Sequence, residues 1–215
     1  MISPMTTPAA APKETSGTPA EVTDTRQHIL DTAEALMAVK GYTAVGLTEV
    51  LTSAGVPKGS FYHYFGSKDA FGEAVLESYF RAYLAGMDAI LAAPGASGVQ
   101  RLMTYWQQFH EKQSIDHGQG RCLVVKLGAE VADLSEAMRS ALQEGTAQII
   151  TRIARMIAAG VEDTTIDAAH LLGDPHQAAS TLYSLWLGAS VLAKVDHDPA
   201  HLDAAMMFTR SQLGL

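Results

Sequence analysis

The sequence predicts an all-α protein, and three observations lead to this prediction. Apolar residues recur at intervals of three and four in almost every segment, as on the buried face of a helix. Gly and Pro residues separate these segments, and no segment alternates strictly between polar and apolar residues. With 215 residues, of which 47% are hydrophobic and 18% charged, the chain fits one or two ordinary globular domains.

The N-terminal part predicts a tail followed by four helices. Residues 1–23 are rich in Pro, Ala, Thr and Ser and are expected to be disordered. The first helix should run from about Thr25 to Lys40, with Gly41 as its C-cap, and Ser67 should cap the fourth helix. The remaining expected ranges are 47–53 for the second helix, 57–64 for the third, which opens on Pro57, and 68–91 for the fourth.

Five further helices are expected in the C-terminal part. They should cover about 99–113, a short stretch beginning near Cys122, 134–159, 175–194 and 199–213. Asp-Pro pairs open the last two. The resulting division is a tail at 1–23, a helix-turn-helix segment at 24–68, and a helical segment at 69–215.

The net charge of −8 has to be read by segment. Residues 24–68 hold four basic and four acidic residues, whereas residues 69–215 hold ten basic and seventeen acidic residues. The acidity therefore lies outside the helix-turn-helix. This distribution excludes a general nucleic-acid binder but does not exclude a locally basic DNA-reading surface.

Two short helices joined by a turn that contains Gly form a DNA-reading device. Gly55 permits positive φ in the turn, and Val56 is expected to pack the two helices together. Lys58 and Lys68 are expected to contact phosphates, while Phe61, Tyr64 and Phe65 are assigned to the core. The groups expected to contact DNA are Thr48, Lys58, Gly59, Ser60, Tyr62, His63 and Lys68.

The run at 54–69, AGVPKGSFYHYFGSKD, closely resembles the signature of TetR-family regulators. Residues 25–33 and 40–42 are similar to the first helix of that family, so the match covers about 24–77. Gly46 departs from the pattern, because many members have a Ser or Thr there that touches phosphate; Thr48 is the expected substitute. The resemblance implies a transcriptional regulator, by the family's commoner mode a repressor, that binds double-stranded operator DNA. It also implies that residues 24–68 form the helix-turn-helix DNA-binding domain and residues 69–215 an effector-binding and dimerisation domain.

The last two expected helices carry a long apolar face. Its residues are Leu182, Leu185, Trp186, Ala189 and Leu192, with Met206, Met207 and Leu213 beyond. The resemblance implies that such helices form a homodimer interface, and a face this apolar needs a partner helix. A purely intramolecular core remains the alternative. A two-fold axis would place two recognition helices roughly 34–36 Å apart, one helical turn of DNA.

Cys122 stands where a helix is expected to begin, and helix N-termini lower the pKa of a thiol. Arg121 is adjacent and Lys126 is one turn further on, so a reactive thiolate is predicted. A lone cysteine that serves only as a small buried hydrophobe is the alternative. Arg121 is also a candidate partner for a carboxylate ligand such as acrylate.

The segments at 120–130, 45–47 and 185–190 resemble an electrophile-sensing branch of the TetR family. That resemblance implies a small-molecule effector such as N-ethylmaleimide, a reactive aldehyde or acrylate, sensed at Cys122 with Lys194 as the matching lysine. Aromatic candidates for an effector pocket are Tyr83, Trp106, Phe109, His110 and Trp186, each of which has a core alternative. The fourth helix is the expected lever between effector and DNA in a two-state mechanism.

Other functions find little support in the sequence. No nucleophile elbow, phosphate loop, zinc-protease motif or dinucleotide fingerprint is present, so no enzyme, catalytic residue or cofactor is predicted. A thiol hydrolase at Cys122 and a helical protein-binding adaptor are the rivals, and the adaptor leaves residues 57–68 unexplained. His197 and His201 are spaced for zinc, but solvent exposure explains them better, and no metal is predicted. A single cysteine and no membrane-length apolar run indicate a cytoplasmic protein.

Overall fold

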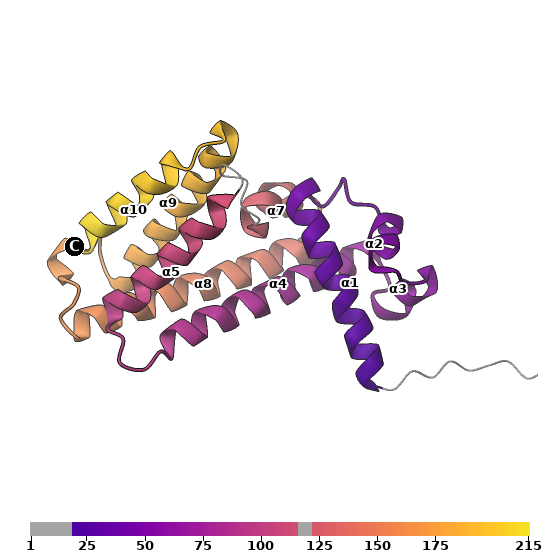
Figure 1. Cartoon of the computed structure of the whole chain (residues 1–215), viewed down its shortest axis with the longest axis horizontal. Coiled ribbons are helices and arrows are strands. Elements are labelled where there is room, and N and C mark those ends of the chain that lie inside the picture. The colour runs from indigo at the N-terminus through magenta and orange to yellow at the C-terminus, as the bar shows by residue number, and fades with distance from the viewer. Residues whose placement is uncertain (1–18, 116–121) are drawn as a thin grey trace, which may run out of the picture.

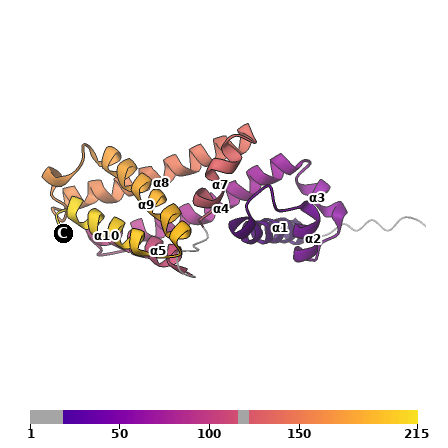
Figure 2. The same ribbon diagram turned by 90° about the horizontal axis from the view of Figure 1, so that it is seen from above.

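The computed structural model describes the backbone of residues 19–115 and 122–215, with side chains from residue 25. Within these ranges the protein is entirely helical, which confirms the predicted fold class. Figures 1 and 2 show two groups of helices at opposite ends of an elongated molecule. The first group is α1 (Pro19–Lys40), α2 (Leu47–Ala54) and α3 (Lys58–Tyr64). The second is α5 (Gly98–Gln113), α8 (Glu136–Glu162), α9 (Pro175–Asp196) and α10 (Ala200–Gln212), with a 3₁₀ turn, η1, at Ala168–His170.

Two helices connect the groups. The long helix α4 (Lys68–Leu91) leaves the N-terminal group and packs along α8, while the short helix α7 (Leu123–Ala132) lies against both α1 and α8 (Figure 1). Near its C-terminal end, α4 is pinned to α8 by Arg152, whose guanidinium donates two hydrogen bonds to the Asp88 carboxylate at 2.8 and 2.9 Å. A paired, planar contact of this kind fixes orientation as well as distance.

The predicted helix boundaries are explained by specific caps. Ser67 accepts a hydrogen bond from the backbone N–H of Ala70 at 3.1 Å and begins α4, as expected. Gly55 has a φ of 67° between α2 and α3, a conformation that L side chains rarely adopt. Asp174 begins α9 in a capping box with Gln177.

Several helix boundaries differ from the expectation, most clearly at the starts of three helices. Helix α1 begins at Pro19, inside the segment that composition assigned to a tail, because Pro suits a first helical position and Ala and Glu follow it. Pro57 is the N-cap of α3 rather than its first residue, with an extended ψ of 147°. Helix α8 begins at Glu136 because Ser135 caps it by accepting a hydrogen bond from Met138 N–H.

The core runs continuously from the N-terminal group into the C-terminal one. In the C-terminal group, Trp106 of α5 stacks on Trp186 of α9 with ring centroids 4.8 Å apart, and neither side chain is exposed. The Trp186 indole N–H donates to Thr209 of α10 at 2.9 Å, which ties three helices together. Among the described residues, no helix combines the length and the hydrophobicity that a membrane crossing requires.

Candidate functional site

The residues expected to contact DNA lie mostly on the open surface of α2 and α3. Thr48, Lys58, Gly59 and His63 are exposed, and the Tyr62 side chain is 59% exposed although it is aromatic. Ser60 is only partly exposed. In the same helix, Phe61 is 1% exposed and packs on Phe65 and Phe71. Of these two neighbouring aromatic residues, Phe61 therefore faces the core and Tyr62 faces the solvent.

Lys68 begins α4 and is exposed beside α3. Its ammonium lies 4.8 Å from the centre of the Tyr42 ring, within the range of a cation–π contact. The Tyr42 hydroxyl lies 3.2 Å from the backbone oxygen of Lys68 and 3.3 Å from the Asp69 carboxylate, and it can donate to either. Burial and the Asp69 charge raise the pKa of Tyr42 to about 12, so this hydroxyl keeps its proton. The loop after α1 therefore holds the first turn of α4.

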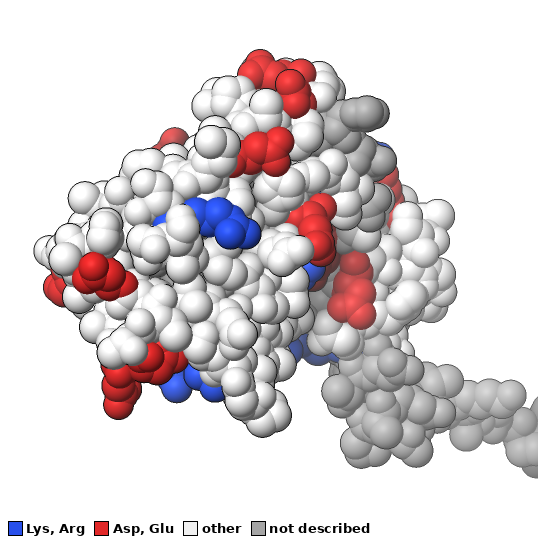
Figure 3. Space-filling model, turned by 60° about the vertical axis from the view of Figure 1, so that its left-hand side comes forward, with Lys and Arg blue, Asp and Glu red and all other residues white. Residues whose placement is uncertain are grey.

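The apolar face of α9 and α10 differs from the one expected. Leu182, Trp186, Ala189 and Leu213 are buried within the chain because they pack into its own core. Leu185 and Met206 are partly buried, and Leu192 and Met207 are exposed. The exposed apolar side chains of this face are Val191, Leu192, Val195, Met207 and Phe208, with exposures from 40% to 72%. Figure 3 brings forward the side of the molecule that carries these two helices, and most of its surface is uncharged.

Cys122 is the N-cap of α7, as the sequence predicted, but its thiol is 6% exposed and lies 3.7 Å from the Tyr79 hydroxyl. Burial raises the pKa of Cys122, even though the backbone N–H groups of Val125 and Val124, the Tyr79 hydroxyl and the Lys194 charge all favour the thiolate. The expectation of a lowered thiol pKa was therefore wrong for this conformation, because the loss of water outweighs the helix N-terminus.

Two lysines share the electrostatic surroundings of the thiol. Burial lowers the pKa of Lys194, the positive charge of Lys126 lowers it further, and Cys122 raises it. Lys194 comes from the C-terminal end of α9 and Lys126 from the first turns of α7, so two segments far apart in sequence meet at Cys122. Arg121, the third expected basic group, lies outside the described residues.

Of the four tyrosines that surround Cys122, the sequence reasoning named only Tyr83, as a pocket candidate, and missed the other three. Tyr79, Tyr83, Tyr105 and Tyr183 come from α4, α5 and α9 and are wholly or largely buried, and the Tyr83 and Tyr105 hydroxyls are 3.0 Å apart. Burial raises the pKa of each, so all four remain neutral hydroxyls. Their spacing fits a buried helix face, and no sequence pattern linked them to the cysteine.

The aromatic pocket candidates are part of the core. Trp106 and Trp186 are stacked and fully buried, and Phe109 packs edge-on against Trp186. The Trp106 indole N–H has no hydrogen-bond partner within the described chain. His110 lies 2.7 Å from the Asp203 carboxylate, which ties α5 to α10. Trp106, Trp186 and Phe109 thus support the C-terminal group of helices from within.

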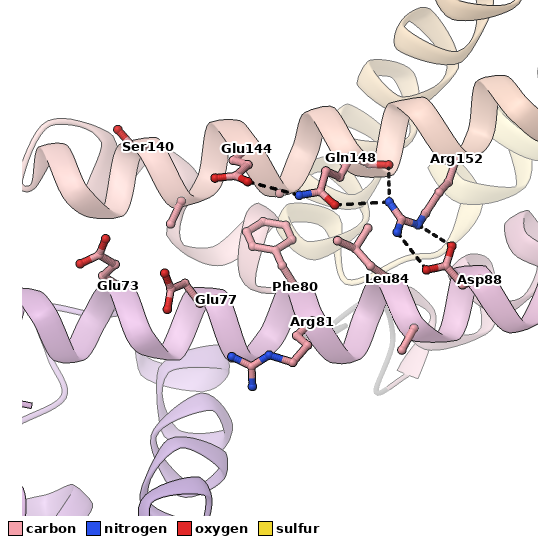
Figure 4. A pocket seen from close by; sticks show the side chains of 13 residues that line it. Glu73, Glu77, Phe80, Arg81, Leu84, Asp88, Ser140, Glu144, Gln148 and Arg152 are labelled. Atoms are coloured by element: carbon pink, nitrogen blue, oxygen red, sulfur yellow. Dashed lines mark hydrogen bonds and ion pairs between the residues drawn. The ribbon is translucent and has the colours of Figure 1, made fainter. Parts of the chain in front are cut away.

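A groove of about 610 Å³ lies between α4 and α8 (Figure 4). Glu73 and Glu77 of α4 and Glu144 of α8 line the half nearer the N-terminal group of helices, and the Asp88–Arg152 pair closes the other end. Like charges across the groove do not hold the helices together there.

The histidine pair does not form a metal site in the described chain, where no group of three or more His, Cys, Asp or Glu side chains converges. His201 instead lies 2.7 Å from the Asp196 carboxylate, and His197 ends α9 with a positive φ of 54°.

Comparison with known proteins agrees with both halves of this architecture. Residues 29–75 match the family described as bacterial regulatory proteins, tetR family, and residues 95–208 match the tetracyclin repressor-like C-terminal domain. The chain is 41% identical over 189 residues to the HTH-type transcriptional repressor NemR of Escherichia coli, spanning 87% of this chain and 93% of that protein. It is 34% identical to the transcriptional regulator AcuR of Cereibacter sphaeroides, spanning 80% of this chain and 76% of AcuR.

The solved structures give the same result. The crystal structure of reduced E. coli NemR superposes with a TM-score of 0.81 at 41% identity, covering 87% of this chain and 95% of that one. Two family descriptions matching successive parts of the chain and a relative that shares its full architecture agree on one assignment. The chain belongs to the tetR family of bacterial regulatory proteins.

Proposed function

We propose that the protein is a transcriptional repressor that binds operator DNA as a homodimer and leaves it when a small electrophile modifies Cys122. The observation that carries the proposal is the position of Cys122, which caps the helix that lies against the DNA-binding group and meets Lys194 from the far end of the chain. The relative NemR is a transcriptional repressor by name and is similar over 87% of this chain, which supports the same role here.

The DNA-contact proposal rests on exposure and charge. Helix α3 presents Lys58, Gly59, Tyr62 and His63 to solvent on one short helix, which suits entry into a major groove. Lys58 and Lys68 stand at the starts of α3 and α4, where backbone N–H groups add to their attraction for phosphate. We assign base contacts to Ser60, Tyr62 and His63, phosphate contacts to the two lysines, and a supporting contact to Thr48.

The homodimer proposal rests on the face formed by Val191, Leu192, Val195, Met207 and Phe208. These side chains project from two adjacent helices and remain exposed after the chain has folded. A second copy that packs the same face about a two-fold axis would cover them in a four-helix contact. It would also present two α3 helices to successive half-sites of DNA.

The sensing proposal requires the thiol to react from a buried position. Because the pKa of Cys122 is raised, the resting thiol is protonated, and the nearby Lys194 charge favours the thiolate once the proton leaves. The four neutral tyrosine hydroxyls around it suit a small uncharged carbonyl compound better than a carboxylate. A free thiol also favours a reducing compartment, and we propose the cytoplasm.

The test compares wild type with Cys122→Ser on duplex DNA from upstream of the protein's own gene, with and without N-ethylmaleimide. We expect the wild type to release DNA on alkylation and the variant to remain bound. Equal release by both would show that the thiol is incidental. Retention of DNA by a wild type whose adduct is confirmed by intact mass would exclude Cys122 as the switch.

A further inference from the structure

The Glu130 carboxylate of α7 holds the loop that follows α1. One of its oxygens accepts a hydrogen bond from Tyr42 N–H at 3.1 Å, and the other accepts one from Thr43 N–H at 2.7 Å. Although burial opposes ionisation, these hydrogen bonds and the Lys126 charge keep the pKa of Glu130 below its usual value. We call this pair of hydrogen bonds the Glu130 clamp.

Gly41 makes the clamp possible. Its φ of +89° turns the chain sharply after α1, and a Cβ at this position would lie 2.8 Å from the Glu130 carboxylate oxygen. The backbone N–H groups of the next two residues then point at one carboxylate, as they do in anion-binding turns. The clamp is therefore built into the loop and does not depend on a flexible surface ion pair.

Tyr42 extends the clamp to the candidate phosphate contact. Its backbone is held by Glu130, its hydroxyl reaches the first turn of α4, and its ring lies under the Lys68 ammonium. A Cβ on Gly72 would lie 2.8 Å from the Tyr42 ring, which shows how closely α4 approaches it. Any shift of the loop after α1 must therefore disturb the position of Lys68.

At its other end, α7 begins at Cys122. The helix has ten residues and is about 15 Å long, so Cys122 and Glu130 are two turns apart on one rigid segment. Leu123, Leu127 and Val131 share its buried face and are at most 1% exposed. With the thiol 6% exposed and against Tyr79, a group added to Sγ cannot fit without displacing the first turn of α7.

We propose that Glu130 is the residue that couples the chemical state of Cys122 to the DNA-binding helices, through the Glu130 clamp on Tyr42 and Thr43. The proposal rests on the proposed function of Cys122. Alkylation by N-ethylmaleimide adds the S–H across the maleimide C=C bond, with Sγ bonding one carbon and the proton going to the other. The adduct moves α7, the clamp opens, and the loop and Lys68 lose the position that suits the operator.

The experiment uses the full-length protein, N-ethylmaleimide, and Glu130→Gln with Glu136→Gln as its matched control. Glu136 is an exposed carboxylate at the start of α8 that pairs with Arg139 and does not touch the DNA-binding group. Glu130→Gln keeps the shape of the side chain but turns an amide NH₂ donor toward a backbone N–H donor, so one of the two hydrogen bonds of the clamp is lost. Before alkylation, we expect Glu130→Gln to bind operator about tenfold more weakly than the wild type, a change within the range of allosteric couplings. Alkylation should then weaken operator binding by the variant by less than about threefold further.

Hydrogen exchange provides a second measurement that does not depend on a variant. In the wild type, alkylation should speed exchange of the Tyr42 and Thr43 amides, because the clamp protects them. Glu136→Gln should behave as the wild type in both measurements.

The two proposals fail in different ways. If the alkylated wild type keeps its DNA, the sensing role of Cys122 fails, and the exchange measurement still decides whether α7 transmits the change. If the wild type releases DNA while both amides stay protected and Glu130→Gln responds fully, the Glu130 clamp is overturned and Cys122 acts by another route.

Discussion

Replacing Lys58 with Ala should change how operator binding depends on salt. Lys58 is an exposed residue that begins α3, and a homodimer would place two copies against phosphates. Each phosphate contact contributes about 0.9 to the slope of log affinity against log salt concentration, so the slope should flatten by about 1.8. When salt rises fourfold, from 50 to 200 mM, the affinity of both proteins falls, and the fold-loss for the variant should be about 12 times smaller than the fold-loss for the wild type. Fluorescence anisotropy with a labelled operator duplex measures both slopes.

The control is Lys112→Ala, which removes the same charge from an exposed position in the last turn of α5, within the C-terminal group of helices. Its slope should match the wild type, because only phosphate-contacting cations release counterions from DNA. A Lys58→Ala slope equal to that of the wild type would refute the reasoning, even with weaker binding, because a phosphate contact must change the slope. Equal flattening in both variants would mean that overall charge, and not contact, sets the salt dependence.

Three further predictions concern the thiol, the dimer and the core. Because burial raises the pKa of Cys122, its alkylation rate should reach half its maximum at a pH above about 8.5, the midpoint of an ordinary thiol; a midpoint below that pH contradicts the raised value. Val195→Glu should give a monomer in sedimentation at micromolar concentration, whereas Val39→Glu, on a similarly exposed valine of α1, should stay dimeric; a dimer in both cases places the interface elsewhere. Trp106→Ala should lower the free energy of unfolding by roughly 3–5 kcal/mol in urea titration, and a loss under 1 kcal/mol would contradict its core role.

The helix order could be predicted because local signals in this chain agree with the fold. Ser67 and Asp174 are strong caps, and Gly55 occupies the one turn that needs positive φ between α2 and α3. The start of α1 could not be predicted, because a Pro/Ala/Thr-rich composition hides a first helical Pro19. Composition averages over a segment, whereas a helix start depends on a single residue and its successors.

The site was harder to predict, since it depends on burial. The sequence placed Cys122 at a helix start correctly. The pKa of its thiol, however, depends on how much water reaches the sulfur, and Tyr79 and the other side chains packed over it decide that. The apolar stripe of α9 showed the same limit. Periodicity identified a buried face at Leu182 and Trp186. Only the packing shows that these two residues are buried in the chain's own core while Val195 remains exposed.

The Asp88–Arg152 pin determines how far the DNA-binding end of α4 moves. Lys68 is twenty residues from Asp88 along one continuous helix, a separation of about 30 Å. A rotation of about 5° around the pin would therefore carry Lys68 by about 2.6 Å, most of the 3.4 Å rise between successive base pairs. An angular change too small to disturb packing near Asp88 becomes a displacement that takes a phosphate contact out of register. Under the proposed function, the operator is read at the end of a long radius, so the C-terminal group of helices can control it with very little motion of its own.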